Sequence, residues 1–387
     1  MARRQRRTID SEVATLLHLP PEICALICSM VEFETLLKLC RVSHSFRNQT
    51  QRIVYRSVNL QRCSRAKRMT WFRSMSRNPQ LGAYLHTLRI PPIDLEEGQR
   101  LAFVLKKCPH LNVLDFQGLN VNNGYSCDAI HTWVIDNMPF RLTHFTNSYF
   151  RSTFLTSFWK KQTGIKVLSL PLVSSADRLV FPCHDGQLPN LIGLEVPNTL
   201  MLPTNSRPLQ RIQLQGHLNA RQTMFDLTVL ARFSSTLTTL NLCLVAMPPF
   251  PSTLHTIAQA VPNLTYLGLA DKVFPWSHQQ FPRSELLALK RLKNLVILSH
   301  HTMVINDASN AQNYTFRDLR SMTQLFMDTC PSLEQTIIGR HGRVRDLAHG
   351  QLLDRTCRMQ RVKETKELVV EMQGDVDFDV VAKFWDA

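Results

Sequence analysis

The residues that could support catalysis or metal binding in this chain of 387 residues are ten cysteines and fourteen histidines. No two cysteines form a Cys-x-x-Cys pair, and Cys24 and Cys28 stand four apart in an apolar helical pattern, which is typical of buried thiols. The adjacent histidines His300 and His301 would point to opposite faces of a strand, so they make a poor metal clamp. The spacing therefore predicts no metal site.

Motifs that cradle phosphates or activate a nucleophile are also missing from the sequence. It contains no Gly-x₄-Gly-Lys-Ser/Thr, no Gly-x-Gly-x-x-Gly, no Gly-x-Ser-x-Gly and no His-Glu-x-x-His. Glycine is scarce, with 13 residues, which argues against phosphate-binding loops. We therefore expect no catalytic residues, no cofactor and no enzymatic activity, and a protein that acts by binding.

The composition is that of a globular protein with a basic surface. Hydrophobic residues make up 44% and charged residues 19% of the chain. The net charge of +15 is spread over most of the chain and is dense only in residues 1–7, which form either a solvated tail or a nuclear-import patch. Such charge supports weak attraction to acidic partners and does not establish nucleic-acid binding. Nucleic-acid binding would require a steep fall of affinity with salt, and we do not expect it.

The first apolar run, residues 13–31, superficially resembles a signal peptide or a membrane anchor. His18, Pro20, Pro21 and Glu22 interrupt it, and such residues suit a bilayer poorly. We therefore expect no membrane association. The wide cysteine spacing predicts no disulfide framework, which favours a reducing compartment, the cytoplasm and/or the nucleus.

Three short helices are predicted within residues 15–60. Pro20 and Pro21 suit the first turn of the first helix, and Ser43 can cap the third. Apolar residues at helical spacing supply their faces: Ile23, Leu26, Ile27, Met30, Leu36, Leu37, Leu39, Cys40, Phe46, Ile53 and Val54. So small a module needs a neighbour or a partner to cover these faces.

The ordered set Leu-Pro-x-Glu-Ile-x₃-Ile, Leu-Leu-x-Leu, Val-Ser-x-x-Phe-Arg and Tyr-Arg-Ser-Val-Asn-Leu over residues 17–60 resembles an F-box. The resemblance implies that the helices dock onto the Skp-type adaptor of a cullin–RING ubiquitin ligase. It places these residues against the adaptor: Leu19, Pro20, Ile23, Ile27, Leu36, Leu37, Val42 and Phe46. Some of them must instead hold the helices together. The alternative is that the helices only cap the scaffold that follows.

Residues 61–78 are basic and interleaved with apolar and aromatic residues. The apolar positions fall at helical spacing, which predicts a helix with a basic outer face. The alternative is a nucleic-acid surface in which bases stack on Trp71 and Phe72.

Residues 61–340 carry a repeat of the form apolar-x-x-apolar-x-apolar. Clear copies start at Leu85, Leu111, Ile165, Leu191, Leu209, Leu237 and Leu264, and weaker copies at Leu142, Leu295 and Leu333. Four copies begin with Pro-x-Leu, and several of these follow amphipathic helical stretches, so proline redirects the chain into the next strand. The pattern predicts an α/β solenoid of short parallel strands with helices or loops on the convex side. It resembles the irregular leucine-rich repeats found behind F-boxes.

Residues between the repeated leucines would line the concave face of the strands. The predicted row runs from Thr87/Arg89 to Ile297/Ser299 and has the mixed polarity of a protein-binding surface or of a plain solvated sheet. Its candidate substrate-binding residues are Arg89, Asp115, His144, Glu195, Arg211, Asn241 and Tyr266.

The two ends of the chain differ from the repeats. Residues 1–14 are predicted to be a disordered basic tail. Residues 341–387 are predicted to cap the last repeat, with Phe378, Phe384 and Trp385 packing back, or to form an acidic binding tail. The whole pattern predicts a substrate-recognition subunit of an SCF-type ubiquitin ligase, bound to a Skp-type adaptor and an unknown protein target, with no homo-oligomer required. The alternative is a repeat scaffold that binds a partner without any ligase.

Overall fold

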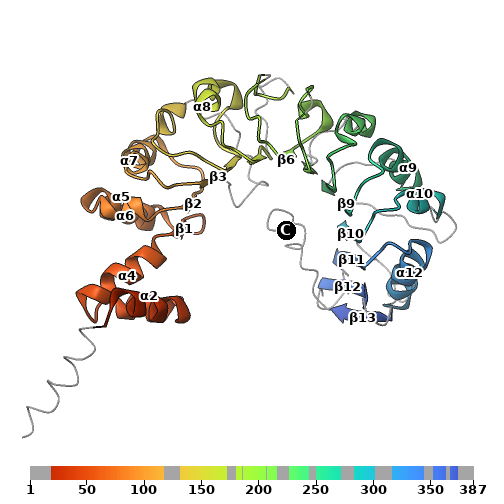
Figure 1. Cartoon of the computed structure of the whole chain (residues 1–387), viewed down its shortest axis with the longest axis horizontal. Coiled ribbons are helices and arrows are strands. Elements are labelled where there is room, and N and C mark those ends of the chain that lie inside the picture. The colour runs from red at the N-terminus through yellow and green to blue at the C-terminus, as the bar shows by residue number, and fades with distance from the viewer. Residues whose placement is uncertain are drawn as a thin grey trace, which may run out of the picture. The chain divides into compact units, whose positions relative to one another are not determined.

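The computed structural model divides the chain into two compact units, Met1–Ile165 and Lys166–Ala387. It describes these residues: 19–116, 131–171, 180–184, 186–205, 207–215, 226–243, 250–271, 283–300, 316–343, 352–362 and 367–373 (Figure 1). The division falls inside the predicted repeat region and not at its predicted start, residue 61. The predicted tail, residues 1–14, and the aromatic residues Phe378, Phe384 and Trp385 lie outside the described residues.

The first unit opens with the three predicted helices and continues as a parallel sheet with helices between the strands. Its helices are α2 (Pro21–Met30), α3 (Phe33–Leu39), α4 (His44–Val54), α5 (Arg65–Arg77), α6 (Gln80–Ala83), α7 (Leu95–Leu105) and α8 (Thr156–Lys161), with short 3₁₀ turns η2 (Thr132–Val134) and η3 (Ser152–Phe154). Its strands are β1 (Ser57–Asn59), β2 (Thr87–Arg89), β3 (Val113–Phe116) and β4 (His144–Asn147). Each strand pairs in parallel with the next along the chain.

The second unit repeats the same plan. Seven parallel strands follow chain order in its described part: β5 (Val167–Ser169), β6 (Gly193–Val196), β7 (Arg211–Gln215), β8 (Thr239–Cys243), β9 (Tyr266–Asp271), β10 (Asn294–His300) and β11 (Gln335–Arg343). The connections carry η4 (Thr199–Met201), η5 (Leu227–Phe233), α9 (Phe250–Ala260), α10 (Arg283–Ala288) and α12 (Phe316–Thr329).

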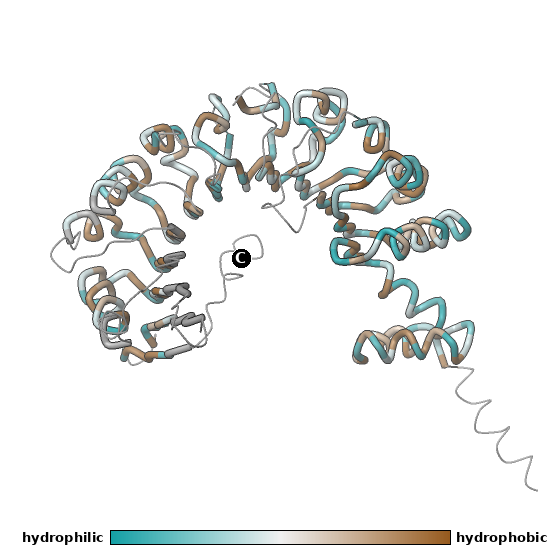
Figure 2. The backbone as a smooth tube through the Cα atoms, turned by 180° about the vertical axis from the view of Figure 1, so that it is seen from behind, coloured by the Kyte–Doolittle hydropathy of each residue, from teal (hydrophilic) through white to brown (hydrophobic). Residues whose placement is uncertain are grey.

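The repeated leucines form the core of both units, as the pattern predicts. In the first unit Leu85, Leu88 and Ile90 are completely buried, and Leu88 lies beside Leu114 of the next strand. In the second unit the corresponding leucines of neighbouring strands lie side by side, for example Leu240 and Leu267. Figure 2 shows this as hydrophobic runs that recur strand after strand.

The proline signals also mark the ends of helices. Helix α9 ends at Ala260 just before Pro262, and α12 ends at Thr329 just before Pro331. Proline cannot continue a helix, and the residue before it prefers extended backbone, so the chain turns there into the following strand. The predicted helix–proline–strand order is confirmed at both places.

Two details of the repeat differ from the prediction. Strand β1 lies within residues 15–60 and pairs with β2, so the sheet begins inside the segment that resembles an F-box. In β10, Leu295 lies beside Leu267, the second apolar position of the copy that starts at Leu264. Leu295 is therefore the second apolar position of its own copy, which starts at Leu292 and not at Leu295. Val296 is consequently the residue between the two apolar positions of this strand, Leu295 and Ile297. Ile297 points into the core, where it is buried.

The C-terminal end of the second unit changes from parallel to antiparallel pairing. Strand β12 (Leu352–Arg361) pairs antiparallel with β11, and β13 (Leu368–Gln373) pairs antiparallel with β12. Cys357 and Met359 of β12 are completely buried. These strands lie within residues 341–387, the segment that the sequence predicts to cap the last repeat.

No helix among the residues that the structure describes is long and apolar enough to cross a bilayer.

Candidate functional site

The three N-terminal helices form a small packed module, as predicted. Helix α2 begins at Pro21 with a second proline at its N-cap, and the Ser43 hydroxyl accepts a hydrogen bond from the Phe46 amide at 3.2 Å, which caps α4. The module has its own core, made by Cys24, Cys28, Leu36 and Phe46. The predicted interpretation of the two cysteines as buried thiols is confirmed, since each is 1% exposed.

The structure divides the predicted adaptor-binding residues into two groups. Leu36 and Phe46 are buried in the module's core, and Leu19 and Ile27 pack partly buried against it, so these four hold the helices together. The other group is exposed to solvent: Pro20, Ile23, Leu37 and Val42. Because burial of Leu36 and Phe46 within the chain leaves no side-chain surface for a partner, only the exposed group offers direct contacts.

Further exposed apolar side chains extend this surface. Leu26 and Met30 follow Ile23 at spacings of three and seven residues, which places all three along one side of α2. Phe33 stands four residues before Leu37 on α3 and shares a side of that helix with it. The exposed fractions of Leu26, Met30 and Phe33 are 56%, 78% and 59%. We call the exposed set Ile23, Leu26, Met30, Phe33, Leu37 and Val42 the apolar helix surface.

Sequence reasoning placed Leu26 and Met30 on one apolar face of the first helix together with Ile23 and Ile27, but it did not separate the exposed residues of that face from the packed ones. The helix packs through Cys24 and Cys28, at i and i+4, so the larger aliphatic residues turn outward. Phe33 was not considered. The signal that could have found these residues is the pair of cysteines itself, since small buried thiols allow α2 to approach α4 closely.

The basic segment after β1 forms helix α5, as predicted. Met69, Phe72 and Met75 are buried, and Arg65, Arg73 and Arg77 lie on the exposed face, whereas Arg68 is largely buried. Phe72 is completely buried and the indole nitrogen of Trp71 is shielded from solvent. Phe72 therefore offers no face to a base, whereas Trp71 is half-buried, so the two rings do not form the pair of stacking platforms that the alternative requires.

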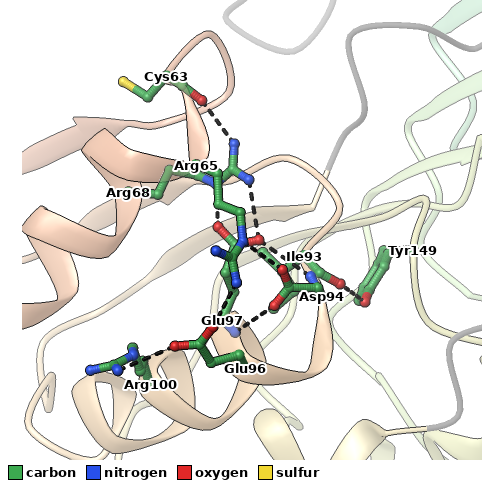
Figure 3. Close-up of polar contacts among 9 residues, drawn as sticks. All are labelled: Cys63, Arg65, Arg68, Ile93, Asp94, Glu96, Glu97, Arg100 and Tyr149. Atoms are coloured by element: carbon green, nitrogen blue, oxygen red, sulfur yellow. Dashed lines mark hydrogen bonds and ion pairs between the residues drawn. The ribbon is translucent and has the colours of Figure 1, made fainter.

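Ion pairs tie α5 to the start of α7 (Figure 3). Arg68 lies 2.7 Å from Glu97, a bidentate pair in which the Glu97 side chain is only 2% exposed. Glu97 also completes a capping box with Asp94, the N-cap of α7. Arg65 pairs at the surface with Asp94 at 2.7 Å and with Glu96 at 2.6 Å.

This surface pair leads to a pH prediction. The hydrogen bond from Arg65, followed by the one from the Glu97 amide, lowers the pKa of the Asp94 carboxyl. A carboxyl with a lowered pKa contributes stability above its ordinary pKa and loses that contribution as the pH falls through the lowered value. We therefore expect the protection of amides at the start of α7 from hydrogen exchange, relative to their intrinsic exchange rates, to fall below about pH 4. Asp94→Asn should flatten this dependence; an unchanged profile would contradict it.

Two of the three first-unit candidates for substrate binding, Arg89 and Asp115, lie at matching positions of neighbouring strands, whereas His144 lies beside Val113. Arg89 is exposed, and its Nε lies 4.0 Å from Oδ2 of Asp115 on the next strand. Gln61 also donates to Asp115 at 3.4 Å. His144 is half-buried on β4, with its Nδ1 2.9 Å from the Thr143 hydroxyl. Arg89 and Asp115 thus come together as expected from the repeat register.

The second-unit candidates are much less exposed. Glu195 is 6% exposed and Asn241 completely buried, whereas Arg211 and Tyr266 are half-buried. Gln213 lies on the strand between Glu195 and Asn241 and joins them, because it donates to Glu195 at 2.8 Å and accepts from Asn241 at 3.3 Å. Ser169 donates to the other carboxylate oxygen of Glu195. A partner that docks from solvent does not reach Glu195 or Asn241 in this arrangement.

We call Ser169, Glu195, Gln213 and Asn241 the polar row. The row ends at Gly268. The five residues occupy the same register position on β5 to β9. A Cβ atom on Gly268 would lie 1.9 Å from Oδ1 of Asn241. The missing side chain therefore makes room for the Asn241 amide, and glycine is required here for close approach.

Gly268→Ala should consequently destabilise the second unit by about 1–3 kcal/mol, because the added methyl group forces Asn241 out of its hydrogen bond. Urea unfolding with hydrogen exchange across β8 and β9 measures this. The matched double variant Asn241→Ala/Gly268→Ala removes the clash and should lose less than the sum of the two single variants. An alanine variant as stable as the wild type would show that the polar row is not rigid.

Features expected of a catalytic or metal site do not assemble in the part of the chain that the structure describes. No group of three or more His, Cys, Asp or Glu side chains there could hold a metal ion. Burial raises the pKa of Cys108, Cys183 and Cys243 to about 12, which keeps these thiols protonated and poorly nucleophilic.

Both units are therefore built as leucine-rich-repeat-type α/β solenoid segments, and the first carries a three-helix module with an exposed apolar surface. No protein-family model and no curated protein matches the chain. Among solved structures, it is similar to LegL7, a leucine-rich repeat-containing protein from Legionella pneumophila, with 14% sequence identity and a TM-score of 0.39 over 77% of this chain and 83% of that chain. The repeat architecture rests on the strand pairing and leucine burial given above rather than on this likeness.

Proposed function

We propose that the chain is the substrate-recognition subunit of an SCF-type E3 ubiquitin ligase. The observation that carries the proposal is the apolar helix surface on a module that already has its own core. Large apolar side chains gathered on the surface of a soluble segment mark an interaction site. The F-box resemblance of residues 17–60 names the partner, a Skp-type adaptor, and Ile23, Leu37 and Val42 are both exposed and within that motif.

The proposed division of labour follows from the fold. The helices hold the ligase, and a strand face of the solenoid holds a protein target. No catalytic group is needed on this chain, because holding the target near a ubiquitin-loaded carrier converts an intermolecular step into a local one. Of the candidate substrate-binding residues, Arg89 is exposed, and Asp115, His144, Arg211 and Tyr266 are partly exposed to solvent.

Proximity-labelling mass spectrometry tests the proposal in cells. The wild-type chain should label a Skp-type adaptor, a cullin and a set of target proteins. Ile23→Asp/Leu37→Asp should lose the adaptor and the cullin and accumulate the targets. If the wild type labels targets but no ligase component, the proposal is wrong.

The second candidate function is a repeat scaffold that binds a partner without a ligase, with the helices as a cap. It is favoured by β1, which follows α4 directly and starts the first unit's sheet. Deleting residues 1–54 leaves β1 in place and separates the two functions. Loss of a cap should unfold or aggregate the repeats, whereas loss of a docking module should leave their melting temperature within a few degrees of the wild type.

A further inference from the structure

The first unit contains a long segment without a single acidic residue. Residues 35–93 hold twelve lysines and arginines and no Asp or Glu. Three of these cations reach carboxylates outside the segment, namely Arg65, Arg68 and Arg89. The other nine make no ion pair with a carboxylate among the described residues.

One group gathers where α4 and α6 end and strands β2 and β3 begin. The guanidinium of Arg52 lies 5.7 Å from the centre of the Tyr84 ring. Arg56 follows one helical turn after Arg52, and its carbonyl accepts hydrogen bonds from the amides of His86 and Thr87 at 2.9 and 3.0 Å. The His86 and His110 rings are stacked, with their centres 6.1 Å apart. The four basic side chains thus lie on adjoining elements.

The end of α7 extends this group. Helix α6 packs so closely on it that a Cβ atom on Gly82 would lie 2.3 Å from the carbonyl oxygen of Lys107. The Lys107 ammonium donates to the carbonyl of Ser76 at 3.1 Å, which holds it beside the end of α5. We call Arg52, Arg56, His86, Lys107 and His110 the basic rim.

The basic rim has a positive potential that its own unit does not neutralise. Among the described residues, none of the five side chains makes an ion pair with a carboxylate. Burial lowers the pKa of His86, and the charges of Arg56 and His110 lower it further, so the permanent positive charge of the rim is carried by Arg52, Arg56 and Lys107. Arg52, Arg56 and His110 are exposed to solvent, so an anion from outside can reach them.

We propose that the basic rim binds an acidic segment of a partner protein. A stretch of carboxylates would neutralise cations that lie on adjoining elements and would relieve their mutual repulsion. A nucleic acid is the less fitting occupant, because cations already lie over the aromatic rings of the rim: Arg52 lies over Tyr84, and the Lys107 ammonium lies 4.0 Å from the centre of the exposed Phe103 ring.

In the context of the proposed function, this segment would belong to the protein that is ubiquitinated. The binding itself needs no adaptor and rests on the first unit alone. Loss of adaptor binding through the apolar helix surface and loss of peptide binding at the basic rim are therefore separate results, and either proposal can fail without the other.

Fluorescence anisotropy of a labelled deca-glutamate peptide with the full chain tests the inference. Arg52→Gln/Arg56→Gln should weaken binding at least tenfold, whereas Lys290→Gln/Arg291→Gln, which removes the same charge from exposed positions in the second unit, should change it less than twofold. His110→Glu gives a second route to the same loss at an exposed position, should the double variant melt early.

Two further probes complete the test. A deca-glutamine peptide should not bind, and a thymidine oligonucleotide of equal charge should bind more weakly than deca-glutamate. Absence of wild-type binding to deca-glutamate, equal losses in the rim and control variants, or tighter binding of the oligonucleotide through the same residues would each overturn the inference.

Discussion

Replacing Ile23 and Leu37 together by aspartate is expected to lower the affinity of the chain for a Skp-type adaptor by at least about 100-fold. The side chains are 43% and 47% exposed, so the change should leave the module folded. Burial of one aliphatic side chain in an interface contributes about 1.5–3 kcal/mol, and a carboxylate in its place must also be desolvated. Two such changes exceed the 2.7 kcal/mol or so that a 100-fold loss requires.

Two control variants separate a specific loss of adaptor binding from a general effect of charge and from loss of the fold. Ser29→Asp/Thr35→Asp adds the same charge at exposed polar positions of α2 and α3 and should change the affinity less than threefold. Phe46→Ala removes a ring from the module's core and should cost about 3–5 kcal/mol of stability, so it loses binding together with the fold. Equal affinity for the aspartate variant and the wild type would show that the apolar helix surface does not face the adaptor.

The second large effect is expected at the Arg68–Glu97 pair, which joins α5 to α7. Arg68→Met should destabilise the first unit by about 3–5 kcal/mol, because it leaves the Glu97 carboxylate buried without its partner. The hydrogen bond from Arg68 to the Cys63 carbonyl at 2.8 Å is lost as well. Urea unfolding followed by hydrogen exchange across α5 and α7 measures this loss locally.

The neighbouring surface pair supplies the matched control. Arg65 makes ion pairs of similar length to Asp94 and Glu96, but all three side chains are about half exposed. Arg65→Met should therefore change the stability far less than Arg68→Met does. Arg68→Met/Glu97→Met removes both buried charges and should recover most of the loss. If Arg68→Met and Arg65→Met are equally mild, the pair does not hold the two helices together.

The repeat was largely predictable because it depends on local spacing. The leucine pattern placed β2 to β4 of the first unit and β5 to β9 of the second unit in register, and the prolines marked the ends of α9 and α12. The error at β10 has a local cause: Leu292, Leu295 and Leu298 are all leucines, so two registers fit the same letters, and only pairing with β9 selects one.

The properties of the candidate sites were less predictable because they depend on contacts between distant residues. Arg68 and Glu97 are 29 positions apart and meet only when α5 packs on α7. Glu195 and Asn241 were expected to be exposed, since their type and position fit an open strand face. Their burial follows from hydrogen bonds through Gln213 on the strand between them, which no local pattern records. Likewise, the outward face of α2 is decided by how its cysteines pack.

The most direct test of the proposed function is a calorimetric titration of the purified full chain with a purified Skp-type adaptor. The account predicts a one-to-one complex with a dissociation constant below about 1 μM, that is, a binding free energy of more than about 8 kcal/mol in magnitude. It also predicts a negative heat-capacity change, because Ile23, Leu37 and the rest of the apolar helix surface leave water on binding. A folded chain that shows no binding at 100 μM adaptor would contradict the assignment of the module as an F-box.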